Sequence, residues 1–255
     1  MDLSFFLDQD ILHSGKQFFE DILGLTVAQP AKSEISVKEF LKEQLTDEAL
    51  LNKVSEARFI GMINDKSIVG KEQIEEVDNF LENHTDDYDM LLVFGMDLKE
   101  GIIPSKTDIS RLTRALNRRS ASRPVVLLTH YSDKLAFSAA ERGQYKRKGQ
   151  RGEKVGRIST LKDIHLTKVH TGHIRILEQL KSDNSIKSFQ KLYERWRQVF
   201  DLSILNEDFY KRIASWYGRA ISEVKFPFRY YENLPENKGK TEKELQEIAN
   251  QIACI

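Results

Sequence analysis

The residues most able to do chemistry in this sequence are the cations and glycines between residues 141 and 173. This stretch contains nine lysines or arginines against three carboxylates, with glycines interspersed. Glycine lets backbone N–H groups approach a ligand closely, and flanking cations favour a polyanion. We therefore predict a phosphate-facing loop followed by a strand, with DNA as the partner. The expected phosphate contacts are Arg142, Lys146, Arg147, Lys148, Arg151, Lys154 and Arg157.

A second group of cations lies upstream, where a helix is predicted over residues 104–118. Arg111, Arg114 and Arg118 form a stripe on this helix with no acid interleaved among them. They therefore lack the usual pairing between residues one helical turn apart. The stripe fits either an ordinary solvated helix face or a track for phosphates.

Two patterns in the basic region are incomplete as ion-dependent sites. The glycines of residues 149–156 lack the Gly-Lys-Ser/Thr ending whose hydroxyl binds magnesium, which argues against ATP hydrolysis. His165, His170 and His173 fall within nine residues, but zinc requires a fourth ligand, so we predict no metal site. We expect His170 and His173 to cap a helix or contact phosphate, or to pack where the sheet meets a helical region.

Asp97-Leu98-Lys99 follows an apolar run and matches the (D/E)-x-K pattern of metal-dependent nucleases. In such a site a carboxylate holds magnesium while the lysine stabilises the charge that develops on the phosphate. An upstream acid is also required, for which Asp65 and Asp89 are the candidates. A surface turn is the competing interpretation, because a three-residue match often arises by chance in a chain that is 31% charged.

Charge is segregated along the 255 residues, although the formal net charge is zero. Residues 1–110 carry a net charge of −13, residues 111–175 carry +12 and residues 176–255 carry +1. The segregation predicts either a basic surface reserved for phosphates or an acidic half packed beside a basic half. The acidic N-terminus, the single Cys254 and the lack of a long apolar run predict a cytoplasmic protein with no disulfide and no membrane segment.

The elements that must position these residues predict an α/β fold, a mixed β-sheet flanked by helices. The apolar runs at 88–95 and 123–129, joined by the helix over 104–118, are typical of buried parallel strands. The strands at 135–140 and 154–161 are expected to form an antiparallel hairpin. Further strands are predicted at residues 57–63 and 67–69, and further helices at residues 4–23, 36–54 and 71–82.

A smaller all-helical region follows the sheet. We therefore predict two domains, an α/β domain over 1–168 and a helical connector over 169–255. The aromatic residues of its amphipathic helices are expected in the core rather than as platforms for stacked bases. The apolar stripe of the last helix is still running at Ile255. This pattern fits equally a chain that continues further and an ordinary short C-terminal helix.

Two stretches carry a family resemblance: ERGQYKRKGQRGEKVGRISTLKDI with HTGHIRIL, and YERWRQVFDLSILNEDFYKRIASWYGRAISEVKFP. They resemble the N-terminal region of large bacterial restriction-modification proteins with a fused adenine-specific DNA methyltransferase. The resemblance covers most of residues 88–228 and implies no catalytic residue. It implies that the methyltransferase domain, a partner within the same parent chain, binds the cofactor SAM. The present sequence contains neither an Asn-Pro-Pro-Tyr or Asp-Pro-Pro-Tyr motif nor a glycine-rich SAM-binding motif.

Three functions follow from these patterns. The first is DNA binding or positioning by the basic surface, with no cofactor in this part of the parent protein. The second is a divergent magnesium-dependent endonuclease built from Asp97 and Lys99 with Asp65 or Asp89. The third is a protein-interaction module that docks on the methyltransferase domain, which exposed apolar stripes on the last helices would favour.

Overall fold

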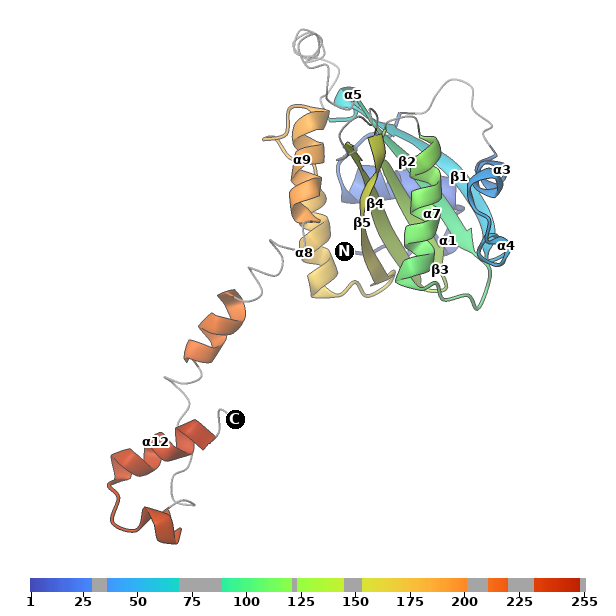
Figure 1. Ribbon diagram of the computed structural model, residues 1–255. Coiled ribbons are helices and arrows are strands. Elements are labelled where there is room, and N and C mark those ends of the chain that lie inside the picture. The colour runs from blue at the N-terminus through green and yellow to red at the C-terminus, as the bar shows by residue number, and fades with distance from the viewer. Residues whose placement is uncertain are drawn as a thin grey trace. The chain divides into compact units, whose positions relative to one another are not determined.

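A five-stranded mixed sheet forms the centre of the computed structural model, which describes residues 1–28, 36–68, 89–120, 123–144, 153–200, 211–219 and 232–252 (Figure 1). The strands are adjacent in chain order: β1 (Val54–Ile63), β2 (Leu91–Leu98), β3 (Val125–Tyr131), β4 (Lys134–Gln144) and β5 (Glu153–His165). β2 and β3 run parallel, whereas every other neighbouring pair is antiparallel. The predicted α/β fold, its parallel pair and its hairpin are confirmed.

The parallel strands are connected by α7 (Lys106–Arg119), which begins with a capping box. The Ser105 hydroxyl accepts the N–H of Asp108, and the Asp108 carboxylate accepts the N–H of Ser105. The box satisfies N–H groups that have no partner within the helix. On the same face of the sheet, α3 (Val37–Gln44) and α4 (Glu48–Leu51) pack with α7 around a core that includes Leu41, Leu50, Met96, Leu112 and Leu127.

Five helical segments contribute to the core on the opposite face of the sheet. They are α1 (Phe5–Asp8), α2 (Ile11–Gln17), the π-helical turn η1 (Phe18–Ile22), α8 (Thr171–Leu180) and α9 (Phe189–Val199). Aromatic rings pack together on this face. The ring of Phe137 in β4 stacks on the ring of Phe200 at a centroid distance of 5.7 Å. Phe137 also meets the ring of Trp196 edge-on at 5.8 Å. These contacts join α9 to the sheet.

Several element boundaries differ from the prediction because caps and turns intervene. Asp10 accepts the N–H groups of Leu12 and His13 and so begins a new helix inside the predicted segment 4–23. The predicted helix over 36–54 is two shorter helices, and β1 already begins at Val54. The predicted strand over 67–69 is wrong, because residues 67 and 68 belong to the helical turn α5 (Asp65–Ile68). The predicted helix over 71–82 lies outside the described residues.

The chain divides into two compact units, Met1–Phe200 and Asp201–Ile255. α8 and α9 belong to the first unit, because Leu177 and Leu192 are buried in the core of the sheet. The boundary predicted at residue 168 therefore lies inside this unit. The second unit contains a helix over 211–219, η3 (Pro235–Asn237) and α12 (Glu242–Ile252). Within the described ranges, no helix is both long enough and apolar enough to cross a membrane.

Candidate nucleic-acid interface

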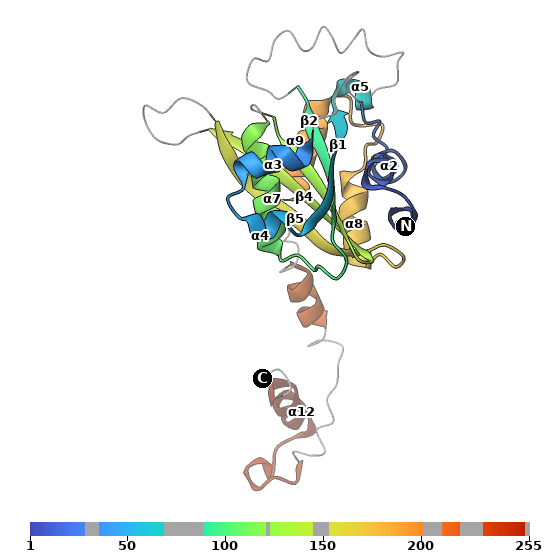
Figure 2. The ribbon, with the colours of Figure 1, turned by 90° about the vertical axis from the view of Figure 1, so that its right-hand side faces the viewer.

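The two ends of the sheet carry different side chains. Where β2 and β3 begin, β4 continues past its neighbour, since Val125 at the start of β3 pairs with Ala140 and β4 extends to Gln144. α7 finishes near this end, because it connects the end of β2 to the start of β3. Figure 2 shows the β4–β5 hairpin projecting beyond the other strands. We name this the arginine end, and the opposite end, where β2 and β3 finish, the histidine end.

Arginines from both faces of the sheet lie at the arginine end. Arg118 of α7 and Arg157 of β5 are exposed there. Glu141 of β4 connects β5 to α9: its Oε1 lies 3.3 Å from Nη2 of Arg157, and its Oε2 lies 3.8 Å from Nε of Arg197. The Glu141 side chain is 19% exposed, whereas that of Arg197 is 56% exposed. A largely buried carboxylate therefore holds two accessible guanidinium groups near each other.

The predicted hairpin cations begin at this same end. In the backbone register, Arg142 pairs with Val155 and Gly143 pairs with Lys154, so both cationic positions lie on adjacent strands. β4 ends and β5 begins at the arginine end. The side chains of Arg142 and Lys154 lie outside the described residues, as do Lys146, Arg147, Lys148 and Arg151.

The predicted arginine stripe of α7 is divided by what surrounds it. Arg111 has an acidic partner, because its Nη1 lies 2.7 Å from Oδ2 of Asp47, the N-cap residue of α4. A hydrogen bond from the Leu50 N–H, followed by the one from Arg111, lowers the pKa of Asp47. Arg114 is half-buried, and Arg118 is exposed near the C-terminus of α7. The stripe therefore contributes to the arginine end mainly through Arg118.

Arg197 and Glu141 are the residues at this end that the sequence did not single out. Arg197 lies on an amphipathic helix whose apolar face packs into the core. Its position on the polar face was the only sequence signal, and many surface residues share that property. Its pairing with Glu141 depends on the packing of α9 against the sheet, which the local pattern does not specify.

His170 and His173 lie instead at the histidine end, at the start of α8. His170 is the N-cap residue, and its Nδ1 accepts the N–H of Gly172 at 3.1 Å. Capping was one of the roles predicted for it. His173 is half-buried, and within the described residues its Nδ1 has no hydrogen-bond partner. Burial, followed by the nearby His170, lowers the pKa of His173.

The predicted nuclease residues are not brought together. Asp97 lies near the end of β2, whereas Asp89 precedes β2, so the two are roughly 26 Å apart along the strand direction. Asp65 follows β1, which is antiparallel to β2, and therefore also lies at the arginine end. Lys99 is exposed just after β2. The fold separates Asp97 and Lys99 from both upstream acids proposed for them.

Asp65 and Asp89 have other partners. Oδ1 of Asp65 accepts the N–H of Phe189 at 2.6 Å, at the first turn of α9. Oδ1 of Asp89 lies 3.4 Å from Nε of Arg123, just before β3. Asp65 therefore connects α5 to α9, and Asp89 forms an exposed ion pair. Both contacts are structural ones.

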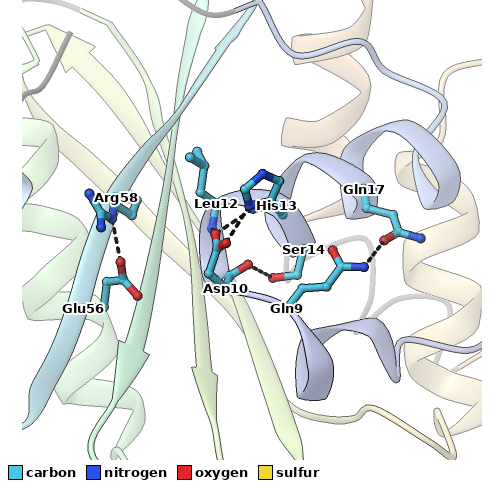
Figure 3. Close-up of polar contacts among 8 residues, drawn as sticks. All are labelled: Gln9, Asp10, Leu12, His13, Ser14, Gln17, Glu56 and Arg58. Carbon is cyan, nitrogen blue, oxygen red and sulfur yellow. Dashed lines mark hydrogen bonds and ion pairs between the residues drawn. The ribbon is translucent and has the colours of Figure 1, made fainter.

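At the histidine end, Asp97 belongs to a row of ionisable residues across three strands. The register places Glu56 opposite Asp97, and Asp97 opposite His130. Nδ1 of His130 donates to Oδ1 of Asp97 at 2.8 Å, and its Nε2 lies 3.1 Å from the Ser132 carbonyl oxygen. Glu56 is paired with Arg58, whose Nε lies 2.6 Å from its Oε1 (Figure 3). The carboxylates of this row are already engaged by cations or by histidine.

The residues around Asp97 do not fit a magnesium site. Within the described part of the chain, no group of three His, Cys, Asp or Glu side chains is placed to hold a metal ion. α1 and α2 also cover this row, since the Phe6 ring lies 6.0 Å from that of His130. Asp10 and His13, which pair with each other at the start of α2, are drawn in Figure 3. At the histidine end, the side chains of this row are paired with neighbouring residues and are partly covered by the N-terminal helices.

Comparisons with known proteins assign no family to this chain. No protein family, no curated protein and no solved structure matches it. The functional interpretation of the arginine end therefore depends on its charge, its geometry and the resemblance of its sequence.

Proposed function

We propose that this protein binds duplex DNA through the arginine end and so positions the duplex for other domains of a restriction-modification protein. The observation that carries the proposal is the shared carboxylate of Glu141, which holds Arg157 and Arg197 beside the strands that lead into the basic hairpin. Guanidinium groups suit phosphates because they stay charged and offer several N–H donors in one plane.

Preorganisation at the arginine end supports the same interpretation. Arg157 comes from β5 and Arg197 from α9, and both elements pack on one core. Side chains that are already held in place lose less conformational entropy when a ligand binds. The spacing of the two cations is therefore set by the fold before DNA arrives.

The excess of positive charge predicts how the binding of DNA should depend on salt and on sequence. Residues 111–175 carry a net charge of +12. The acids described at this end, Asp65, Asp89 and Glu141, are each engaged by the contacts given above. Contacts to phosphates carry no sequence information, so binding should be sensitive to salt and tolerant of sequence.

The family resemblance extends this proposal to the parent protein. A DNA-positioning module would work beside the adenine-specific methyltransferase domain, which would bind SAM, in the bacterial cytoplasm. No cofactor is proposed for the present chain. A magnesium-dependent nuclease is not proposed either, because the residues around Asp97 do not fit the ion.

The test is binding of a fluorescent DNA duplex by the full chain across a salt series. Replacing Arg157 and Arg197 together by Gln should weaken binding about tenfold at low salt. The slope of log K against log salt should become shallower by about 1 for each arginine–phosphate interaction removed. The control is Arg58→Gln, because Arg58 is also exposed and paired with a carboxylate but lies at the histidine end. The control should bind like the unaltered protein.

Two outcomes would contradict the proposal. The first is an unchanged affinity and salt dependence in both the double variant and a variant with Arg147, Lys148 and Arg151 reversed to Glu. The second is equal weakening by Arg58→Gln, which would mean that the effect depends only on net charge. The reaction products are also separated on a gel with magnesium present. Cutting that disappears in Asp97→Ala would restore the nuclease interpretation.

A further inference from the structure

The β4–β5 hairpin continues beyond the sheet as a two-stranded ribbon. β3 begins at Val125, which pairs with Ala140, and β4 continues past this pair beside β5. The last backbone pair of the ribbon joins Gln144 to Glu153. At about 3.4 Å per residue, residues 141–144 extend β4 by about 14 Å past the start of β3. The arginine end therefore presents a narrow projecting element (Figure 2).

A β-bulge lies at the base of the ribbon. The register of β4 against β5 shifts between Ala140 and Arg142, so Glu141 faces two residues of β5, one of which is Arg157. A bulge bends and twists the strand pair at the point where it occurs. The Glu141 carboxylate also ties this point to α9, because it pairs with both Arg157 and Arg197. The direction in which the ribbon leaves the sheet is therefore set by the fold.

α7 and α9 hold the two strands of the ribbon from opposite faces of the sheet. On one face, Oγ1 of Thr113 in α7 lies 3.1 Å from Oγ of Ser138 in β4. The same Ser138 oxygen lies 3.1 Å from Oγ1 of Thr160 in β5. On the other face, the ring of Phe137 in β4 lies 5.8 Å from that of Trp196 in α9. The base of the ribbon is therefore held between two helices.

Each of these helices carries an exposed arginine in its last turn. Arg118 lies in the last turn of α7, and Arg197 lies in the last turn of α9. The side chain of Arg197 is 56% exposed, and its Nε is the atom that faces Glu141. Since packed layers of secondary structure are about 10 Å apart, the two helices are about 20 Å apart. One arginine therefore lies on each side of the ribbon.

A ribbon with a cation on each side matches the major groove of B-form DNA. This groove is about 12 Å wide and admits a two-stranded β-ribbon, and a phosphate backbone lines each side of it. The minor groove is only about 6 Å wide, which is too narrow for two strands about 4.8 Å apart with their side chains. The major groove of an RNA duplex is deep and narrow. The shape of the arginine end therefore favours one groove of one kind of duplex.

We propose that the β4–β5 ribbon enters the major groove of B-form DNA, while Arg118 and Arg197 hold phosphates of the two strands that border this groove. The inference rests on the proposed function, because it specifies how the arginine end binds a duplex. Binding is then limited to a duplex whose major groove is open. Duplex RNA is a poor ligand, and bulky groups in the major groove of DNA prevent binding.

The experiment uses the full 255-residue chain and three labelled duplexes of one sequence, followed by anisotropy. The first duplex is unmodified DNA, the second contains glucosylated 5-hydroxymethylcytosine in place of cytosine, and the third is RNA. Glucose on C5 of cytosine fills the major groove and leaves the phosphates unchanged. The glucosylated DNA and the RNA should each bind about tenfold or more weakly than unmodified DNA. Netropsin, which occupies the minor groove, should leave the affinity for unmodified DNA unchanged.

Single variants test whether both sides of the ribbon meet DNA. Arg118→Gln and Arg197→Gln should each make the slope of log K against log salt shallower by about 1, and the double variant by about 2. Lys106→Gln is the matched control for α7, because Lys106 is an exposed cation at the opposite end of that helix. Arg175→Gln is the control on the other face, since Arg175 is exposed on α8. Both controls should keep the slope of the unaltered protein.

Four outcomes would overturn this inference. They are equal affinity for glucosylated and unmodified DNA, equal affinity for the RNA and DNA duplexes, displacement of the protein by netropsin, and a salt slope that changes in only one of the two arginine variants. In each case, salt-sensitive binding of DNA that depends on Arg157 and Arg197 would leave the proposed function intact. If unmodified DNA shows no salt-sensitive binding, the proposed function is wrong and the inference is wrong with it.

Discussion

The two ends of the sheet use charge in different ways. At the histidine end, two histidines each pair with a carboxylate: His130 with Asp97 at 2.8 Å, and His165 with Asp133 at 3.3 Å. At the arginine end, Asp89 also pairs with one arginine, Arg123, but the carboxylate of Glu141 serves two arginines. Groups that neutralise one another hold elements of the fold together, whereas surplus charge leaves a field that attracts an oppositely charged partner.

The difference shows why reactive side chains that are close in sequence do not by themselves identify a functional site. Asp97 and Lys99 match a nuclease pattern, yet Asp97 is engaged by His130 and lies far from the acids predicted to assist it. The basic residues before and after the hairpin match no catalytic motif. Arg118, Arg157 and the hairpin positions Arg142 and Lys154 nevertheless lie at one end of the sheet.

The largest effect on stability is expected from Gly95→Ala in β2, and this variant also shows whether a change of packing in the core reaches the arginine end. Gly95→Ala places a Cβ 2.6 Å from Cγ1 of Ile11 and 2.9 Å from Cδ1 of Ile60, between β2 and α2. The overpacking should lower the free energy of unfolding by about 1–3 kcal/mol, measured by urea denaturation. Gly218→Ala is the control, since nothing lies within 4 Å of a Cβ there. Duplex affinity should be unchanged in folded Gly95→Ala protein, and a loss would show that the ends are coupled.

A smaller effect is expected at the arginine end from Asp65→Ala. This change removes the acceptor of the Phe189 N–H at the start of α9. Loss of such a helix-terminal bond should cost about 1 kcal/mol of stability. Asp89→Ala should cost less than about 0.5 kcal/mol, because its ion pair with Arg123 is exposed. Equal stability of the two variants would argue that Asp65 has no structural role and would reopen its assignment to a site.

The smallest effect concerns pH and belongs to the histidine end. Burial, then His170, lowers the pKa of His173, while Asp163 opposes the shift and His165 adds to it. A histidine with a lowered folded-state pKa contributes stability that is present above the unfolded-state pKa of about 6.5 and is lost as pH falls through the folded-state pKa. His173→Gln should therefore reduce the loss of stability between neutral and mildly acidic pH. Thermal unfolding across this range checks the prediction, and an unchanged pH profile would contradict it.

Most of the fold could be predicted because local patterns determine it. The apolar runs before Asp97 and after Arg123 indicated buried strands, and the helix between them required a parallel crossover. The predicted boundary at residue 168 lies inside the first compact unit. α8 and α9 look like a separate helical region, but their apolar faces complete the core beneath the sheet. Amphipathic periodicity predicts a buried face without saying what buries it.

The sequence by itself indicated most of the strands, the parallel pair, the hairpin, the segregation of charge and the identity of the cations. Tertiary structure decided which of those charges are engaged. Arg111 donates a hydrogen bond to Asp47, which is 64 residues away in the chain. Asp65 accepts the N–H of Phe189, which is 124 residues away. It also decided that Trp196 is buried while Trp216 is exposed. The reason is physical: strand and helix formation depends on neighbours along the chain, whereas pairing and burial depend on which elements the fold brings into contact.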